Sequence, residues 1–90
     1  MSYYYIEHTL AKLGIPSTHV HYRAIWVYPV LAPYVHSTMV VTPHPSRPDF
    51  AEEVSHGMGF TIKSALDFTC RRLMCSLLAR YREVFESTPF

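Results

Sequence analysis

The apolar positions of the chain form two helical patterns that enclose three short extended ones. Between residues 3 and 13, apolar side chains recur three or four residues apart, which is the spacing of one helix face. Gly14 is placed to end this helix, and Pro16 prevents its continuation. A second apolar stripe with the same spacing begins at Ile62 and continues to about Phe85. We therefore predict one helix near each end of the chain.

The segment between the two helices has the composition of β-strands. Residues 19–30 are rich in Val, Tyr, Ile and Trp, and residues 36–42 combine Ser and Thr with Met and Val. A loop with prolines at 43, 45 and 48, which cannot pair as a central strand, separates the second strand from a short third one at residues 50–55. The predicted element order is therefore α-β-β-β-α, in the α+β class.

Two glycines and a helix start provide the most specific motif of the chain. Gly57 and Gly59 suit a backbone that needs a positive φ or a close approach, and Thr61 can cap the helix that follows. With Lys63 and Ala65 behind them, these residues resemble the end of a double-stranded-RNA-binding domain, where a Gly-x-Gly turn precedes Ser-Lys-Lys-x-Ala-Lys.

Two further stretches resemble the same family, and they occur in the family's order. Residues 10–22 are similar to the exit of its first helix, and the segment from Ala32 to Met39 is similar to its Gly-Pro-x-His-x-x-x-Phe loop, with His36 displaced by one place. The resemblance covers roughly Ile6 to Leu78. It implies one domain over residues 1–90, with a core at about 3–80 and a C-terminal helix extension and tail at 81–90. It also implies a three-stranded antiparallel sheet with two helices packed on one face.

The residues that carry RNA binding in the family are poorly matched here. Family members contact RNA through the first helix, the His loop and a lysine triad at the start of the second helix. In this chain Ile62 and Leu66 replace two lysines of the triad, so most of its phosphate neutralisation is lost. The net charge of the chain is only +1. Weak or shape-only duplex RNA recognition therefore stays an alternative. Its candidate residues are His8, His36, Lys63 and Arg71.

Composition favours a protein partner instead. Hydrophobic residues make up 49% of the chain and charged residues only 17%, below the roughly 25% of ordinary globular domains. A domain of 90 residues cannot readily bury so much apolar material, and exposed apolar patches usually mark interaction sites. We therefore predict a non-catalytic protein–protein interaction or dimerisation module, with a homodimer as the expected assembly.

Periodicity within the strands and the second helix suggests which residues make that contact. Side chains of the first strand alternate between two faces. The resemblance implies that Val20, Tyr22, Ala24 and Trp26 lie against the helices, which leaves an outer set that includes Ile25 and Val27. In the second helix, Ala65, Thr69, Leu73, Leu77 and Tyr81 form the expected core line, whereas Tyr81, Val84 and Phe85 lie where the helix is expected to extend past the domain. The candidate contact residues are Ile25, Val27, Val40, Ile62, Leu66, Tyr81 and Phe85.

Motifs for catalysis or metal binding are weak in this sequence. Cys70 and Cys75 lack the Cys-x-x-Cys spacing of zinc sites, and His19 and His21 have no second ligand pair at a recognisable interval. The Gly57-x-Gly59 motif lacks the Gly and Lys of a phosphate-binding loop. Asp67, Glu52 and Glu53 do not form a spaced carboxylate pair. We therefore expect no enzyme activity, catalytic residue, metal, cofactor or small-molecule substrate.

Targeting signals are also weak. The N-terminal residues combine no positive region with an apolar run of signal-peptide length, and no segment reaches the 18 apolar residues of a membrane span. The two cysteines would point to different faces of one helix, so a disulfide between them is not expected. We therefore expect an intracellular protein, cytoplasmic or nuclear, without a membrane partner.

Overall fold

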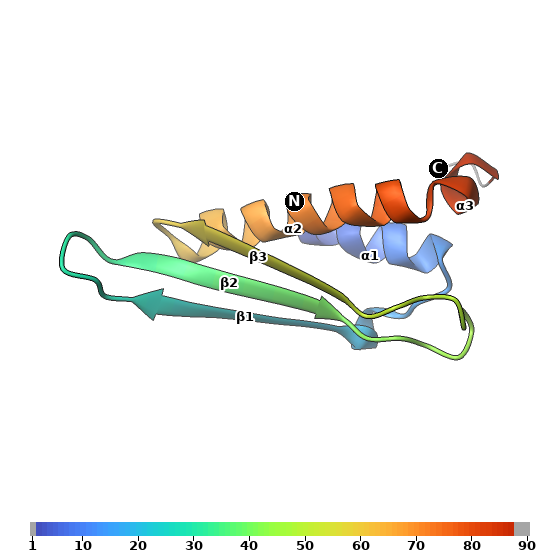
Figure 1. Ribbon diagram of the computed structural model, residues 1–90, viewed down its shortest axis with the longest axis horizontal. Coiled ribbons are helices and arrows are strands. Elements are labelled where there is room, and N and C mark those ends of the chain that lie inside the picture. Colours follow the sequence, from blue (N-terminus) through green and yellow to red (C-terminus); the bar gives the residue numbers. More distant parts are fainter. Residues whose placement is uncertain (1, 88–90) are drawn as a thin grey trace.

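The computed structural model describes residues 2–87, and it describes side chains for residues 5–86. Residues 1 and 88–90, which include the end of the predicted C-terminal tail, lie outside the described part. The α-β-β-β-α order and the α+β class are confirmed (Figure 1). The three strands form one antiparallel sheet in the order β1-β2-β3. The elements are α1 (Ser2–Lys12), the single 3-10 turn η1 (Ser17–His19), β1 (Val20–Val27), β2 (Tyr34–Val41), β3 (Glu53–Gly59), α2 (Ile62–Arg80) and α3 (Arg82–Ser87).

The alternation of side chains along the central strand β2 shows that one face of the sheet is covered and the other is not. Its residues alternate strictly, so that Val35, Ser37, Met39 and Val41 are buried whereas the residues between them are only half-buried. Both α1 and α2 lie on the side of the buried set (Figure 1). This is the predicted arrangement of two helices on one face of the sheet, and it leaves the other face without a helix among residues 2–87.

The hydrophobic core lies where α1, the C-terminal half of α2 and one end of the sheet meet. From α1 it receives Ile6 and Leu10, and from the turn that follows it receives Leu13; each is at most 1% exposed. Gly14 ends α1 with a φ of +77°, as its predicted place after the helix requires. The amide of Ile15 then donates to the carbonyl of Leu10 at 2.9 Å, which satisfies a helix-end acceptor.

The two glycines of the predicted turn lie inside β3. We expected the third strand at residues 50–55, but it spans Glu53–Gly59, and neither Gly57 nor Gly59 has a positive φ. Their role is the close approach of the sheet to α2, because a Cβ on Gly59 would lie 2.7 Å from the amide nitrogen of Ala65. Of the two roles expected for these glycines, the close approach is therefore confirmed and the positive φ is wrong.

Small polar side chains complete this close contact between β2, β3 and α2. The Ser37 hydroxyl donates to the carbonyl of Ala65 at 2.9 Å and also contacts the Thr69 hydroxyl. The Ser55 hydroxyl donates to the carbonyl of Thr69 at 3.0 Å. Since these buried hydroxyl groups all have partners, α2 can lie directly on the strands without leaving polar groups unsatisfied.

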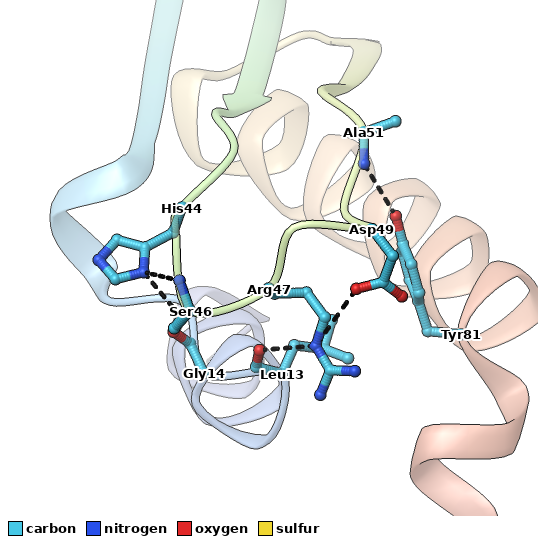
Figure 2. Close-up of polar contacts among 8 residues, drawn as sticks. All are labelled: Leu13, Gly14, His44, Ser46, Arg47, Asp49, Ala51 and Tyr81. Atoms are coloured by element: carbon cyan, nitrogen blue, oxygen red, sulfur yellow. Dashed lines mark hydrogen bonds and ion pairs between the residues drawn. The ribbon is translucent and has the colours of Figure 1, made fainter.

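The proline-rich connection between β2 and β3 is fastened to the helices (Figure 2). Arg47 Nε donates to the carbonyl of Leu13 at 3.2 Å, and the Ser46 hydroxyl donates to the carbonyl of Gly14. Phe50, predicted to begin the third strand, lies in this loop instead; it is buried and its ring stacks on Tyr81 at 5.1 Å. The loop thereby closes one end of the core.

The C-terminal helix is interrupted, contrary to the single helix predicted up to Phe85. α2 ends at Arg80, and Tyr81 adopts a non-helical ψ of 33° before α3 begins. The Tyr81 side chain is buried, and its hydroxyl accepts a hydrogen bond from the amide of Ala51 at 3.3 Å (Figure 2). Val84 and Phe85 pack against the core. Tyr81 is therefore a core residue, and the prediction that these side chains extend past the domain is wrong.

A charged contact joins the start of β3 to the end of α2. The Glu53 side chain is only 5% exposed, and its Oε1 lies 2.8 Å from Arg80 Nη1 in an ion pair that lacks hydrogen-bond geometry. Its Oε2 accepts a hydrogen bond from the Ser76 hydroxyl at 3.1 Å. A buried carboxylate is costly unless it is paired, so Arg80 has a clear structural role.

Candidate interaction surface

The uncovered face of the sheet, which we call the outer face, carries apolar side chains from all three strands. Ile25 of β1 and Val54 and Met58 of β3 are 42–62% exposed, and the cross-strand pairs Ile25–His36 and His36–Met58 place two of them in one row. Val27 and Val40 lie on the same face and are half-buried. Ile25, Val27 and Val40 therefore share one face of the sheet, but Val27 pairs with Tyr34 and Val40 pairs with His21, so these two lie toward opposite ends of the strands.

Histidines occupy the middle of the outer face. The rings of His36 and His56 are stacked with their centroids 5.5 Å apart, and His56 Nδ1 lies 3.2 Å from the Thr38 hydroxyl. Arg23, in the same cross-strand row as Thr38 and His56, is the single formal charge on the strand segments of this face.

Ile62 and Leu66 lie on a different surface from the three outer-face candidates. Together with Tyr22, Met39 and Cys70 they line a groove of about 440 Å³ between β1 and the first turns of α2, on the helix side of the sheet. The groove is open because α2 lies over β2 and β3. As a result Tyr22 and Trp26, although on the predicted inner side of β1, remain largely exposed.

The four residues of the RNA alternative are divided between the two sides of the sheet. His8 is exposed on α1, while Lys63 and Arg71 are exposed on α2. His36 lies instead in the middle of the outer face, stacked on His56, and not in the connection between β1 and β2. The displaced register noted in the sequence therefore moves this histidine from a loop into a strand.

The helix that begins near Lys63 has a well-formed N-terminus. The Thr61 hydroxyl accepts from the amide of Ser64 at 3.0 Å, and the Ser64 hydroxyl accepts from the amide of Thr61 at 3.1 Å. This capping box confirms the predicted role of Thr61. It also shows that two amides at this end of the helix are already satisfied within the chain.

Potential catalytic and metal-binding groups are dispersed. Within residues 2–87, no group of three or more His, Cys, Asp or Glu side chains is arranged to hold a metal ion. His19 and His44 form an edge-to-face pair at 4.8 Å, and their imidazoles are hydrogen-bonded to the hydroxyls of Thr42 and Ser46, respectively. Such contacts account for both histidines as structural residues, because they join His19 at the end of η1 to the β2–β3 loop that contains His44.

The two cysteines differ sharply in environment. Cys70 is buried beside Met39, whereas Cys75 is exposed. Burial, with a smaller contribution from the charge of Asp67, raises the pKa of the Cys70 thiol from its ordinary value of 9.0 to about 11. Only the thiolate is a strong nucleophile, so Cys70 is unsuited to nucleophilic catalysis near neutral pH.

We expect iodoacetamide to modify Cys75 of the folded chain at pH 8 and to leave Cys70 unmodified until the chain unfolds. Because the folded chain disfavours the Cys70 thiolate, the stability that this protonated thiol contributes is present below about pH 9 and is lost as the pH rises toward 11. Mass spectrometry of labelled peptides, with and without denaturant, measures both rates. Equal labelling of the two cysteines in the folded chain would contradict the burial of Cys70.

Sequence reasoning missed two features of the surface. Val54 and Met58 belong to the outer face, and their alternation with Ser55 and Gly57 was a usable signal that the misplaced third strand concealed. Residues 28–30 were included in the predicted first strand, whereas they lie in the connection between β1 and β2, whose exposed apolar side chains were therefore not recognised.

Comparison with known proteins does not identify a family. No family model matches the chain, and no curated protein is significantly similar to it. No helix within residues 2–87 combines the length and the apolar character needed to cross a bilayer.

Proposed function

We propose that this chain is a non-catalytic association module, similar in fold to a double-stranded-RNA-binding domain, and that it forms a homodimer through its outer face. The observation that carries the proposal is the exposure of Ile25, Val54 and Met58 on a sheet face that no helix among residues 2–87 covers. A sheet packed on one side only is normally polar on the other, so an apolar outer face favours a second layer.

A second copy of the chain fits this face chemically. A two-fold dimer uses the same patch on both partners, so the patch must tolerate contact with itself. On the outer face, the strands carry apolar and histidine side chains in the middle. The one formal charge of the strands on this face, Arg23, is on the edge strand β1. A long arginine side chain at an edge can keep its charged group in water while its stem covers apolar surface.

The size of the face sets the expected strength of the dimer. Three strands of seven to eight residues present roughly 25 by 14 Å, so two stacked faces bury about 700 Å² in projection. This is below the roughly 1,200–2,000 Å² that stable specific interfaces bury, so the contact belongs with weak, transient interfaces. We therefore expect a reversible dimer whose population depends on concentration in the micromolar range.

Ile25→Lys is expected to abolish this dimer, because it would place two buried ammonium groups in the interface without partners. Light scattering over a concentration series should give a mass that rises toward twice 10.4 kDa for the native chain and stays at the monomer value for the variant. Lys63→Glu serves as the control, since Lys63 lies on α2 away from the outer face, and it should dimerise like the native chain. A native chain that remains monomeric at high micromolar concentration would overturn the proposal.

The RNA-binding alternative predicts the opposite pattern. A duplex-RNA titration at low salt should show binding that weakens as salt rises and that Lys63→Glu reduces severalfold, while Ile25→Lys leaves it unchanged. The placement of His36 on the other side of the sheet from His8, Lys63 and Arg71 argues against one continuous RNA contact. For this reason we place association through the outer face first.

A further inference from the structure

The connection between β1 and β2 is an apolar tip at one end of the molecule. Residues 28–33 (Tyr-Pro-Val-Leu-Ala-Pro) are all exposed, and Val30 and Leu31 are 102% and 97% exposed. In Figure 1 this loop extends beyond the start of α2, at the opposite end of the long axis from α3. Connections are ordinarily rich in polar residues, yet the hydroxyl of Tyr28 is the single polar side-chain group in this one.

Aromatic side chains surround the base of the tip. Trp26 and Tyr28 stack with their ring centroids 6.4 Å apart, and both are exposed. Phe60, which is also exposed, follows Gly59, and Gly59 lies in the same cross-strand row as Trp26. The tip thus has fully exposed aliphatic side chains at its apex and aromatic ones behind them. Tyr and Trp favour the boundary between water and hydrocarbon, where one end of the ring is wet and the other is not.

The backbone of the tip is also suited to a non-aqueous contact. Unpaired amide groups oppose the entry of a loop into lipid, because no water is present there to satisfy them. Pro29 and Pro33 have no amide hydrogen, so two of the six residues in this connection need no hydrogen-bond acceptor. Both prolines also restrict the loop, which lowers the entropy lost when it is immobilised.

The charge distribution permits an approach to an anionic surface. Neither the tip nor the strands β1 and β2 that carry it contain an acidic residue, and Arg23 is the basic residue of these two strands. Lys63 is exposed three residues after Phe60, and Asp67, one turn further along α2, is the acidic residue of the adjoining groove. Nothing negatively charged therefore lies on the tip itself.

We propose that this tip inserts into the interface of a lipid surface, with Val30 and Leu31 entering the acyl boundary and Trp26, Tyr28 and Phe60 lying at headgroup depth. A lipid surface is favoured over a protein pocket because the tip projects from the end of the sheet, carries its aliphatic groups at the apex and has exposed aromatic groups behind them. The proposed binding is peripheral, so the lack of a spanning helix within residues 2–87 does not bear on it.

The single tryptophan of the chain makes the proposal directly measurable. Trp26 is partly exposed at the base of the tip, so insertion should move its fluorescence emission to shorter wavelength. The titration uses the full chain with phosphatidylcholine vesicles, with and without phosphatidylserine, and co-sedimentation measures the bound fraction. We expect binding to both vesicle types and stronger binding to those containing phosphatidylserine, since interfacial affinity combines buried apolar area with attraction to anionic lipid.

A double substitution in the apex separates insertion from general adsorption. Val30→Ser with Leu31→Ser should lower vesicle binding at least about tenfold and abolish the emission shift, because two buried aliphatic side chains are lost. The control, Leu78→Ser, removes an exposed aliphatic side chain from α2 near its C-terminal end, away from both the tip and the outer face, and this variant should bind vesicles like the native chain. The apex is fully exposed, so the apex variant should keep the native thermal unfolding curve.

Two outcomes would overturn the lipid proposal. One is a native chain that neither sediments with the vesicles nor shifts its Trp26 emission, which would turn attention to a protein partner with a pocket for Leu31. The other is an apex variant that binds as tightly as the native chain. The dimer is tested separately, by light scattering without vesicles, so failure of the lipid proposal and failure of the proposed dimer can be distinguished.

Discussion

Gly59→Ala should destabilise the chain by about 2 kcal/mol, the range expected for overpacking a closely fitted contact. The added Cβ would lie 2.7 Å from the amide nitrogen and 3.1 Å from the Cα of Ala65. Both are backbone atoms of α2, so no rotamer change can relieve the contact, and β3 and α2 must move apart. Urea unfolding followed by circular dichroism measures the loss as a lower midpoint.

Gly14→Ala is the matched control for this prediction. Gly14 has a φ of +77°, and a Cβ there would meet a side-chain atom, Ser46 Oγ, at 3.2 Å. The expected cost is about 1 kcal/mol, arising mainly from the left-handed backbone conformation. The structure therefore predicts a larger loss at Gly59 than at Gly14. Native stability of Gly59→Ala would contradict the close approach of β3 to α2.

Arg80→Met should destabilise the chain by about 2 kcal/mol, because it leaves the Glu53 carboxylate buried without its counter-charge. Breaking a fully buried ion pair costs more, but the Arg80 side chain is 53% exposed and water near it will partly replace the guanidinium. The Ser76 hydroxyl still donates to Glu53 Oε2 in the variant. Unfolding midpoints in urea at pH 7 provide the measurement.

The two partners of this ion pair should respond unequally. Glu53→Leu leaves Arg80 in water, where its charge is solvated, so its cost should be below about 1 kcal/mol. The double variant, Glu53→Leu with Arg80→Met, should recover most of the stability that Arg80→Met loses. A cost for Glu53→Leu equal to that for Arg80→Met would show that the buried carboxylate is not the source of the effect.

Helix ends that are determined by residues within one turn were predicted correctly from the sequence. Gly14 ends α1 and Thr61 caps α2 as expected, because each acts within one helical turn. The buried line of α2 was likewise visible, since Ala65 and Leu73 recur at helical spacing and are fully buried.

Signals that depend on distant contacts were misplaced. Gly57 and Gly59 were expected to allow either a positive φ or a close approach, and the sequence alone could not name α2 as the neighbour that approaches them. Tyr81 was placed both on the core line of the helix and in an exposed extension, because its partner, Phe50, belongs to a loop whose path the sequence does not indicate. In the proposed interface, the outer-face residues of β1 and β2 could be predicted from the alternation of side chains along each strand. The outer-face residues of β3 were missed because the third strand was predicted at the wrong residues.

The position of α2 over β2 and β3 has a consequence for the handling of this protein. It leaves β1, an edge strand of eight residues, with exposed Tyr22, Ile25 and Trp26 and no strand beside its free edge within residues 2–87. Natural edge strands are usually protected by prolines, bulges or several charges, whereas β1 has only Arg23. Concentrated solutions should therefore form strand-added aggregates that start at β1, and a lysine introduced into that edge should slow their growth.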